Sequence, residues 1–354
     1  MRLDELEKLA RRRRLDAVAV CDPANICALT GVTCDNAVLV LETGRAEKAG
    51  RRMRTRVTFY TDFRYVPMVH RVAPSLPCRD IRRVRLAGRR IGFESSVPHA
   101  RVLDLRSHAG RAARFVDVAS DLLALRAVKT ADEIARLRAA ERLVCDIWET
   151  ARARFRAGMT ERDMARLVRL LMVEKGDGEA FPTIVCVGAN AAECHHEPDD
   201  TVWNGRDGVL VDLGVRLDGV CSDLTRNIPP KRRDALYRKV YALVEEANRA
   251  AIAAARPGMT AKALDKVARD VIAKGGFGRC FGHSLGHGVG LEIHEAPTVS
   301  KRGKMTLRPG MVFTVEPGIY LEGRLGVRIE DLVLLTEDGC EVLSVDRPRA
   351  SLVK

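Results

Sequence analysis

The sequence predicts an α/β (α+β) protein made of two parts, a small N-terminal α/β domain over residues 1–125 and a duplicated domain over residues 126–354. Helical and strand-like segments alternate in the first part. A helix-start signal at Thr130 marks the boundary, and the motif Gly158-Met-Thr160 recurs as Gly258-Met-Thr260. A chain of 354 residues is long enough to build a hydrophobic core in each part.

The first part has the alternation of a small α/β domain. Leu3, Leu6 and Leu9 are spaced as one face of a helix over about residues 3–14. Apolar runs then predict strands at 16–21, 37–41, 57–60 and 90–93, separated by turns and arginine-rich loops. The histidines of this part are scattered, so we expect no catalytic constellation in it.

The composition limits the classes of partner and compartment. The net charge is +13, but basic residues are not interleaved with aromatic ones, so specific nucleic-acid binding is not expected. No apolar run reaches the roughly 18 residues of a membrane span, and the N-terminus lacks a signal peptide's apolar stretch. Ten cysteines without a CxxC pair are typical of reduced thiols, so we expect a cytoplasmic protein.

The second part begins with a long helix. Thr130-Ala-Asp-Glu133 is typical of a capping box, with Thr130 as the N-cap and Glu133 as its partner at the third helical position. Apolar residues then follow in steps of three and four, at Ile134, Leu137, Ala140, Val144 and Ile147. The domain boundary is therefore placed just before this helix.

An internal repeat with an offset of 100 residues organises the second part. An amphipathic helix follows each Gly-Met-Thr motif and ends near a glycine, Gly176 in the first copy and Gly275 in the second. Each copy continues through a His-Glu motif to a glycine that opens an apolar strand, and that strand delivers a carboxylate. Because the period is too long for a solenoid, we expect a duplicated half-domain with a pseudo-two-fold axis and a cleft between its halves.

Residues 209–226 supply the first acidic pair. Asp212 and Asp223 stand in apolar, strand-like surroundings, where a lone carboxylate is costly to bury. Asp218-Gly219 is a hairpin signal, and folding about it brings the two carboxylates within a rung or two of each other. A divalent cation would turn their repulsion into attraction. The alternative is one surface aspartate and one aspartate near a turn.

The second copy repeats this chemistry. Glu316 lies in an apolar run at 312–318, Glu330 lies in another at 327–331, and residues 322–326 form the expected loop between them. Each half thus offers an acidic pair, and the axis would bring the four carboxylates together. Two divalent cations would offset their charge. Oxygen-rich ligation with one imidazole favours Mn, Co, Fe or Zn over a thiolate-selecting metal.

Histidines cluster beside these hairpins, since five of the eight fall between residues 195 and 294. His283 and His287 stand four apart in a glycine-rich run, and a strand would turn both toward the same side. We therefore expect functional roles for these two and for His195 and His294. A strand neighbour points the other way, so His196 is expected to be structural.

These motifs together resemble the pita-bread metallopeptidases, most closely the Xaa-Pro aminopeptidases and Xaa-Pro dipeptidases (prolidases). The resemblance rests on Asp212, Asp223, Gly282-His-Ser-Leu-Gly-His-Gly288, His294-Glu-Ala-Pro297, Thr314-Val-Glu-Pro-Gly318 and Val327-Arg-Ile-Glu-Asp331. Pro23-Ala-Asn-Ile26 and Thr61-Asp-Phe-Arg-Tyr65 resemble the creatinase/prolidase type of non-catalytic N-terminal domain. The resemblance implies a catalytic domain with a curved, mostly antiparallel sheet, and a homodimer.

The resemblance also implies a metal centre that acts on proline-containing peptides. Its ligands would be Asp212, Asp223, His287, Glu316 and Glu330, of which Asp223 and Glu330 bridge two ions. The implied cofactor is two divalent metal ions per chain, with Mn as the leading candidate and Co, Zn or Fe as alternatives.

Further residues match catalytic and substrate-binding positions of the family. Glu316 would carry the proton of a bridging water. His294 would hydrogen-bond the scissile carbonyl oxygen as it becomes an oxyanion, and His195 would assist the leaving proline nitrogen. His283 and Arg328 would shape the proline side of the pocket. Pairing with a ligand carboxylate is an equally good reading of Arg328.

Three alternatives share the fold. They are a non-catalytic binding protein, an amidino hydrolase without metal, and a methionine aminopeptidase. The filled ligand positions argue against the first two, and the additional N-terminal domain argues against the third. Val220 and Cys194 stand where the family often has an aromatic residue and a proline. These departures leave the shape of the pocket, and so the preference for dipeptides or longer peptides, open.

Overall fold

The computed structural model describes residues 2–44 and 55–344. Contacts between Cα atoms divide the chain into two compact units, Met1–Arg126 and Ala127–Lys354. Of the predicted domains, residue 1 and residues 45–54 and 345–354 lie outside the described residues. Among the described helices, none is long and apolar enough to cross a membrane.

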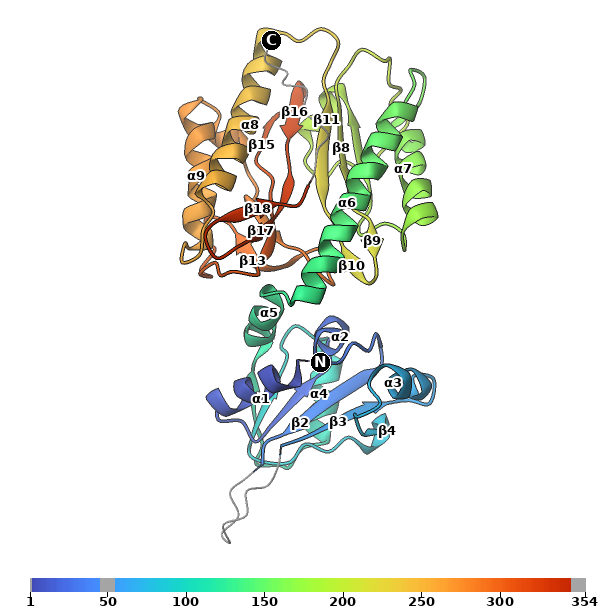
Figure 1. Cartoon of the computed structure of the whole chain (residues 1–354), viewed down its shortest axis with the longest axis vertical. Helices are drawn as coiled ribbons and strands as arrows, with labels where there is room; N and C mark the ends of the chain where they lie inside the picture. Colours follow the sequence, from blue (N-terminus) through green and yellow to red (C-terminus); the bar gives the residue numbers. More distant parts are fainter. Residues whose placement is uncertain (1, 45–54, 345–354) are drawn as a thin grey trace. The chain divides into compact units, whose positions relative to one another are not determined.

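A six-stranded mixed sheet forms the N-terminal unit, with strand order β4-β3-β2-β1-β5-β6 (Figure 1). The strands are β1 (Ala17–Val20), β2 (Ala37–Glu42), β3 (Arg56–Thr61), β4 (Cys78–Asp80), β5 (Arg90–Phe93) and β6 (Arg114–Asp117). β1 runs antiparallel to β2 and parallel to β5. The helices are α1 (Leu3–Arg12), α2 (Pro23–Thr30), α3 (Val66–Val72), α4 (His99–Ser107), α5 (Ala119–Ala127) and the 3-10 helix η1 (Ile81–Arg83).

Local signals explain where the first helices of this unit begin and end. α1 is shorter than the predicted 3–14, because the chain turns at Arg14 with a φ of 53°. Asp22 begins α2 by accepting a hydrogen bond from the backbone N–H of Asn25. Gly31 ends α2 with a φ of 80°, a left-handed conformation that glycine adopts without strain.

The second unit places strands between two pairs of helices (Figure 1). The helices are α6 (Ala131–Arg154), α7 (Glu161–Lys175), α8 (Ala235–Ala254) and α9 (Ala261–Lys274), with 3-10 helices η2 (Gly188–Ala192) and η3 (Gly278–Cys280). In the view of Figure 1, α6 and α7 lie on one side of the strands and α8 and α9 on the other. The predicted capping box is confirmed, because Thr130 and Glu133 exchange hydrogen bonds at the start of α6.

The described strands of the second unit pair only antiparallel, as the fold prediction expects. They are β7 (Ile184–Val187), β8 (Val209–Leu213), β9 (Arg216–Leu217), β10 (Val220–Cys221), β11 (Leu224–Ile228), β12 (Gly286–Gly288), β13 (Glu295–Val299), β14 (Val312–Val315), β15 (Gly318–Leu321), β16 (Leu325–Arg328), β17 (Asp331–Leu335) and β18 (Cys340–Val342). The larger sheets have the orders β11-β8-β7 and β13-β12-β14-β17-β18, and β9-β10 and β15-β16 form separate ribbons.

The sequence repeat is a repeat of structure. Thr160 caps α7 and Thr260 caps α9, each through its hydroxyl. Gly158 and Gly258 both adopt positive φ, at 96° and 83°. The same turn thus starts the same helix in each half, as a duplicated half-domain requires.

The two acidic hairpins hold their carboxylates at corresponding places. Thr225 of β11 lies opposite Asp212 of β8, which places Asp223 two residues along from that pair. The predicted turn at Asp218-Gly219 is confirmed, since both residues have positive φ and join β9 to β10. Folding back by β15 and β16 brings the ends of β14 and β17 together, so that Val315 pairs with Asp331.

One detail of the second hairpin differs from expectation. Residues two apart on one strand share a face, so the sequence predicts a common strand face for Arg328 and Glu330. The structure differs, because the two residues do not lie on one strand. β16 ends at Arg328 and β17 begins at Asp331, so the chain changes strand between them. The physical reason is that β16 pairs with β15 while β17 pairs with β14, in a different sheet.

Candidate metal centre and active site

The five predicted metal ligands come from both halves of the second unit. β8 carries Asp212, Asp223 lies between β10 and β11, β12 carries His287, Glu316 follows β14, and Glu330 precedes β17. The Nε2 atom of His287 lies 3.5 Å from Asp223 Oδ2 and 3.5 Å from Glu316 Oε1. One ligand atom from each of Asp223, His287 and Glu330 lies within 4.8 Å of the others.

The direction of the His287 hydrogen bond favours a cation at its other nitrogen. Nδ1 lies 3.1 Å from the carbonyl oxygen of Gly288, which can only accept, so we assign the proton to Nδ1. Nε2 then turns its lone pair toward the carboxylate oxygens of Asp223 and Glu316, which can only accept when they are ionised. Burial and the neighbouring His294 lower the pKa of His287 to about 4, so the ring is neutral near pH 7.

The carboxylates of the cluster carry more negative charge than their surroundings neutralise. Burial and then the charge of Glu330 raise the pKa of Asp223 well above its usual range. Burial and then the charge of Glu316 do the same for Glu330. Burial raises the pKa of Glu316 to about 8, against the attraction of Arg328. A divalent cation would relieve this repulsion.

Asp212 supplies a further sign that a cation fits here. Its Oδ2 accepts a 2.7 Å hydrogen bond from Arg328 Nη2. Its Oδ1 is buried and has no hydrogen-bond partner among the residues that the structure describes. Buried polar atoms are nearly always satisfied, so an orphaned carboxylate oxygen beside other carboxylates is a natural metal ligand. Four carboxylates and one neutral imidazole suit a hard or borderline divalent ion.

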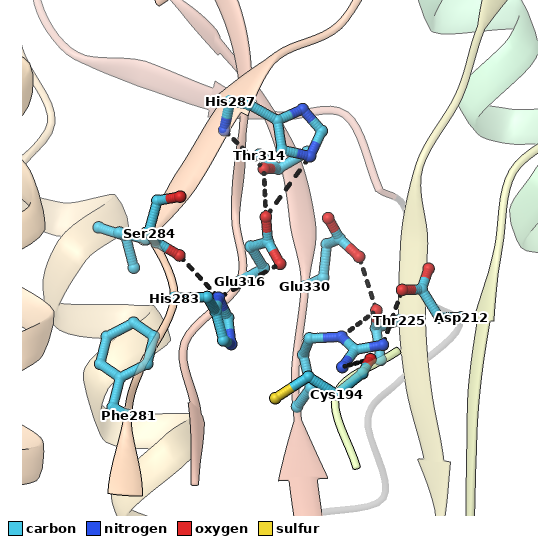
Figure 2. Close-up of polar contacts among 12 residues, drawn as sticks. Cys194, Asp212, Thr225, Phe281, His283, Ser284, His287, Thr314, Glu316 and Glu330 are labelled. Carbon is cyan, nitrogen blue, oxygen red and sulfur yellow. Dashed lines mark hydrogen bonds and ion pairs between the residues drawn. The ribbon is translucent and has the colours of Figure 1, made fainter. Parts of the chain in front are cut away.

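Two threonine hydroxyls, which sequence reasoning missed, orient the ligands (Figure 2). The Thr225 hydroxyl donates to Glu330 Oε2 at 2.6 Å, and the Thr314 hydroxyl donates to Glu316 Oε1 at 3.3 Å. Thr314 also accepts the backbone N–H of His287. Each threonine stands two residues from a ligand carboxylate in an apolar strand run, and residues two apart share a strand face. That spacing was the available signal.

Glu141 of α6 is a second missed residue. It is fully buried and accepts the backbone N–H of Asp223 at 3.2 Å and the hydroxyl of Ser344 at 2.6 Å. Burial raises the pKa of Glu141 to about 7. Glu141 follows Ala140 on the apolar face that predicted this helix, so a carboxylate on that face was the sequence signal.

The predicted substrate-binding residues meet at Tyr320, which sequence reasoning also missed. His283 Nδ1 lies 2.8 Å from the Ser284 carbonyl oxygen, so we assign the proton to Nδ1 and leave Nε2 to accept from the Tyr320 hydroxyl at 2.9 Å. Arg328 Nη1 in turn donates to the Tyr320 oxygen at 3.0 Å. Figure 2 shows His283 beside Glu316, whose Oε2 lies 3.9 Å from Nδ1. Arg328 thus bonds both Asp212 and this phenol.

The remaining predicted catalytic histidines are exposed. His195 follows η2, and His294 immediately precedes β13. The ring of His294 lies edge-on to His287, with centroids 4.4 Å apart. The neighbour of His195, His196, is buried, and its Nε2 lies 2.7 Å from Glu161 Oε2. The structural role predicted for His196 agrees with this contact.

Comparisons with known proteins give the family. Residues 135–337 match metallopeptidase family M24, and residues 2–128 match the creatinase/prolidase N-terminal domain. An Xaa-Pro dipeptidase of Pyrococcus furiosus is 33% identical over 97% of this chain and 97% of its own length.

Solved structures agree with this result. The prolidase from Pyrococcus furiosus superposes with a TM-score of 0.85 at 31% identity, covering 97% of this chain and 100% of that one. An X-Pro aminopeptidase from Thermotoga maritima gives 0.82 at 30% identity, covering 97% and 99%. The fold, the acidic hairpins and the length of the match together place this chain in metallopeptidase family M24, with a creatinase/prolidase N-terminal domain.

Proposed function

We propose that the protein hydrolyses Xaa-Pro peptide bonds at the N-terminus of short peptides, as an Xaa-Pro dipeptidase or Xaa-Pro aminopeptidase. The observation that carries the proposal is the neutral His287, whose Nε2 lone pair faces buried carboxylate oxygens. That arrangement is satisfied by a metal ion and by few other groups. The names of the related dipeptidases and aminopeptidase supply the substrate class.

We infer that two divalent ions bind per chain, held by Asp212, Asp223, His287, Glu316 and Glu330. When bound, such ions would polarise the scissile carbonyl and supply a nucleophile at neutral pH. The oxygen-rich ligand set supports Mn as the leading candidate, with Co, Zn or Fe as alternatives.

The protein's own residues divide the proton transfers in this proposal. A carboxylate oxygen of Glu316 takes up the proton that is released at the attack. An imidazole N–H of His294 donates to the scissile carbonyl oxygen as negative charge develops on it. His195 gives a proton to the proline nitrogen as the C–N bond breaks. Both histidines are exposed, so a substrate can reach them.

The proline side of the pocket is assigned to His283, Tyr320 and Arg328. Arg328 donates to Asp212, Thr225 and Tyr320, which supports a role in holding the ligand carboxylate and the phenol in place. His283 Nε2 accepts a hydrogen bond from the Tyr320 hydroxyl, which holds the ring in one orientation. We infer that His283 offers the direct contact to proline and that Arg328 acts through Asp212 and Tyr320.

Two further features belong to the proposal. The ten cysteines are free thiols in the structure, which supports a reducing compartment such as the cytoplasm. We also propose a homodimer, as the family resemblance implies. Light scattering on the purified protein tests the dimer, and a monomer at micromolar concentration would contradict it.

The substrate class is tested by loading the purified protein with Mn²⁺ and comparing three peptides: Ala-Pro, Ala-Pro-Ala and Ala-Ala. We expect cleavage before proline and little or none of Ala-Ala. The ratio between the first two separates dipeptidase from aminopeptidase action. Equal cleavage of Ala-Ala, or no cleavage of any peptide by protein that retains metal, would contradict the proposal.

A further inference from the structure

A buried ion pair lies beneath the loop that joins β12 to β13. Lys129 Nζ lies 2.6 Å from Glu295 Oε2, and only 3% and 1% of the two side chains are exposed. Taking two charges out of water is costly and is offset only when the geometry is good. A pair this deeply buried therefore needs a structural or functional explanation.

The loop is built closely around this pair. Glu295 Oε1 accepts the backbone N–H of Glu292 at 3.1 Å, and the N–H of Gly290 donates to the carbonyl oxygen of Glu292 at 3.0 Å. A Cβ atom on Gly290 would stand 2.5 Å from Lys129 Nζ and 2.6 Å from Glu295 Oε2. A larger residue at position 290 would therefore displace either the loop or the charged ends of the pair.

Lys129 is itself held in place by the backbone. Its N–H donates to the carbonyl oxygen of Gly310 at 2.8 Å, and its neighbour Val128 forms a β-bridge with Met311. The next residue, Thr130, is the N-cap of α6. The backbone of Lys129 is therefore fixed, and its buried ammonium group holds the loop through the Glu295 carboxylate.

The position of His294 follows from this attachment. His294 immediately precedes Glu295, which is the first residue of β13. Glu295 points inward to Lys129, whereas His294 is exposed and lies edge-on to His287 at 4.4 Å. Fixing the Glu295 side chain fixes the backbone from which His294 projects.

We propose that Lys129 and Glu295 are positioning residues for His294: their buried ion pair holds the 289–294 loop so that the imidazole meets the scissile carbonyl oxygen. This inference rests on the proposed function of His294. Neither residue of the pair touches the substrate. A misplacement of about 1 Å in such a donor can cost on the order of 100-fold in rate.

The test uses two variants that disturb the pair in different ways. Removing one charge leaves the other buried and unpaired, which endangers folding, so the first variant is the neutral double replacement Lys129→Met with Glu295→Gln. The second is Gly290→Ala, which keeps both charges but forces the loop and the ion pair apart. The control removes an exposed pair of the same unit, Lys266→Met with Asp270→Asn.

With Mn²⁺-loaded protein and Ala-Pro, we expect both test variants to lose about 10- to 100-fold in kcat with KM and metal content nearly unchanged. We expect the control pair to retain wild-type kcat. A conservative Lys129→Arg replacement, which keeps the ion pair, should retain most of the wild-type kcat. Folded variants with wild-type kcat, or a loss confined to KM or to metal content, would overturn the inference.

A measurement without metal or substrate separates this inference from the proposed function. The Cε1–H resonances of His287 and His294 in metal-free protein should show an NOE between the rings that is lost in both test variants. If the wild-type protein cleaves no Xaa-Pro peptide, the proposed function fails while this measurement still decides the positioning. Retention of the ring contact in both folded variants contradicts the inference.

Discussion

Two buried clusters of the second unit each bring carboxylates and a histidine together, and they differ in how their charges are met. Glu161, His196 and Asp199 form one, and Asp223, His287 and Glu330 form the other. In both, ligand atoms lie within 4.8 Å of one another. By distance and residue type alone, either could hold a metal ion.

The Glu161 cluster is complete without a cation. Glu161 accepts from the backbone N–H groups of Val187 and Asp199 and from Asn190 Nδ2. Both ring nitrogens of His196 face carboxylate oxygens, at 2.7 Å from Glu161 and 3.2 Å from Glu193. Burial lowers the pKa of His196, but these hydrogen bonds outweigh it and raise that pKa, which favours the imidazolium form beside the two carboxylates.

The Asp223 cluster has the opposite balance. His287 donates its Nδ1 proton to the Gly288 carbonyl oxygen and turns the lone pair of Nε2 toward the carboxylates. Burial and mutual repulsion raise the pKa values of Asp223 and Glu330. Hydrogen-bond direction, and not proximity, therefore identifies the cluster that is suited to a metal ion.

The largest expected effect comes from breaking the second cluster. Asp223→Asn removes a charge that two ions would share, so we expect metal content to fall and kcat/KM for Ala-Pro to drop by about 1000-fold or more. Elemental analysis and a peptide assay measure the two effects. An Asp223→Asn protein that keeps its metal and most of its activity would show that the cluster is not the metal centre.

The same change in the first cluster should affect stability instead. Glu161→Gln removes the buried charge that faces His196 and accepts three N–H groups, which we expect to cost about 3–5 kcal/mol of unfolding free energy. Metal content per folded chain should not change. Denaturant unfolding measures the stability, and elemental analysis measures the metal content. Loss of metal without loss of stability would show that the Glu161 cluster binds the metal.

The clusters also predict how pH acts on metal-free protein. The pKa of Glu316 is raised to about 8 from a usual value of 4.5. Folding therefore favours the protonated form of Glu316. Its contribution to the free energy of unfolding is complete below about pH 4.5 and is lost as the pH rises to 8. We expect thermal stability of metal-free protein to fall between pH 5 and pH 8. Glu316→Gln should flatten this slope, and an unchanged slope would contradict the assignment.

The smallest expected effect lies at the edge of the second cluster. Tyr320→Phe removes the hydroxyl that links Arg328 to His283 but leaves every proposed metal ligand in place. Loss of such buried hydrogen bonds, each worth about 1–3 kcal/mol, should raise KM for Ala-Pro by several-fold with metal content unchanged. Steady-state kinetics measure the change. A fall in bound metal would instead place Tyr320 among the groups that support the ligands.

The sequence predicted the fold and the grouping of the four carboxylates, because they recur in two copies of one hairpin. The family resemblance added His287 as the fifth candidate ligand. The sequence did not predict Tyr320 or Glu141, whose roles depend on contacts between segments far apart in the chain. The role of Arg328 was left open for the same reason. Its side-chain contact with Asp212 connects β16 to β8, and no local sequence pattern indicates that contact.

The most direct test is manganese anomalous scattering from crystals of protein loaded with Mn²⁺. We expect two peaks per chain, within ligand distance of Asp212, Asp223, His287, Glu316 and Glu330, and none beside His196. A peak between Glu161 and His196, or no peak beside His287, would contradict this expectation.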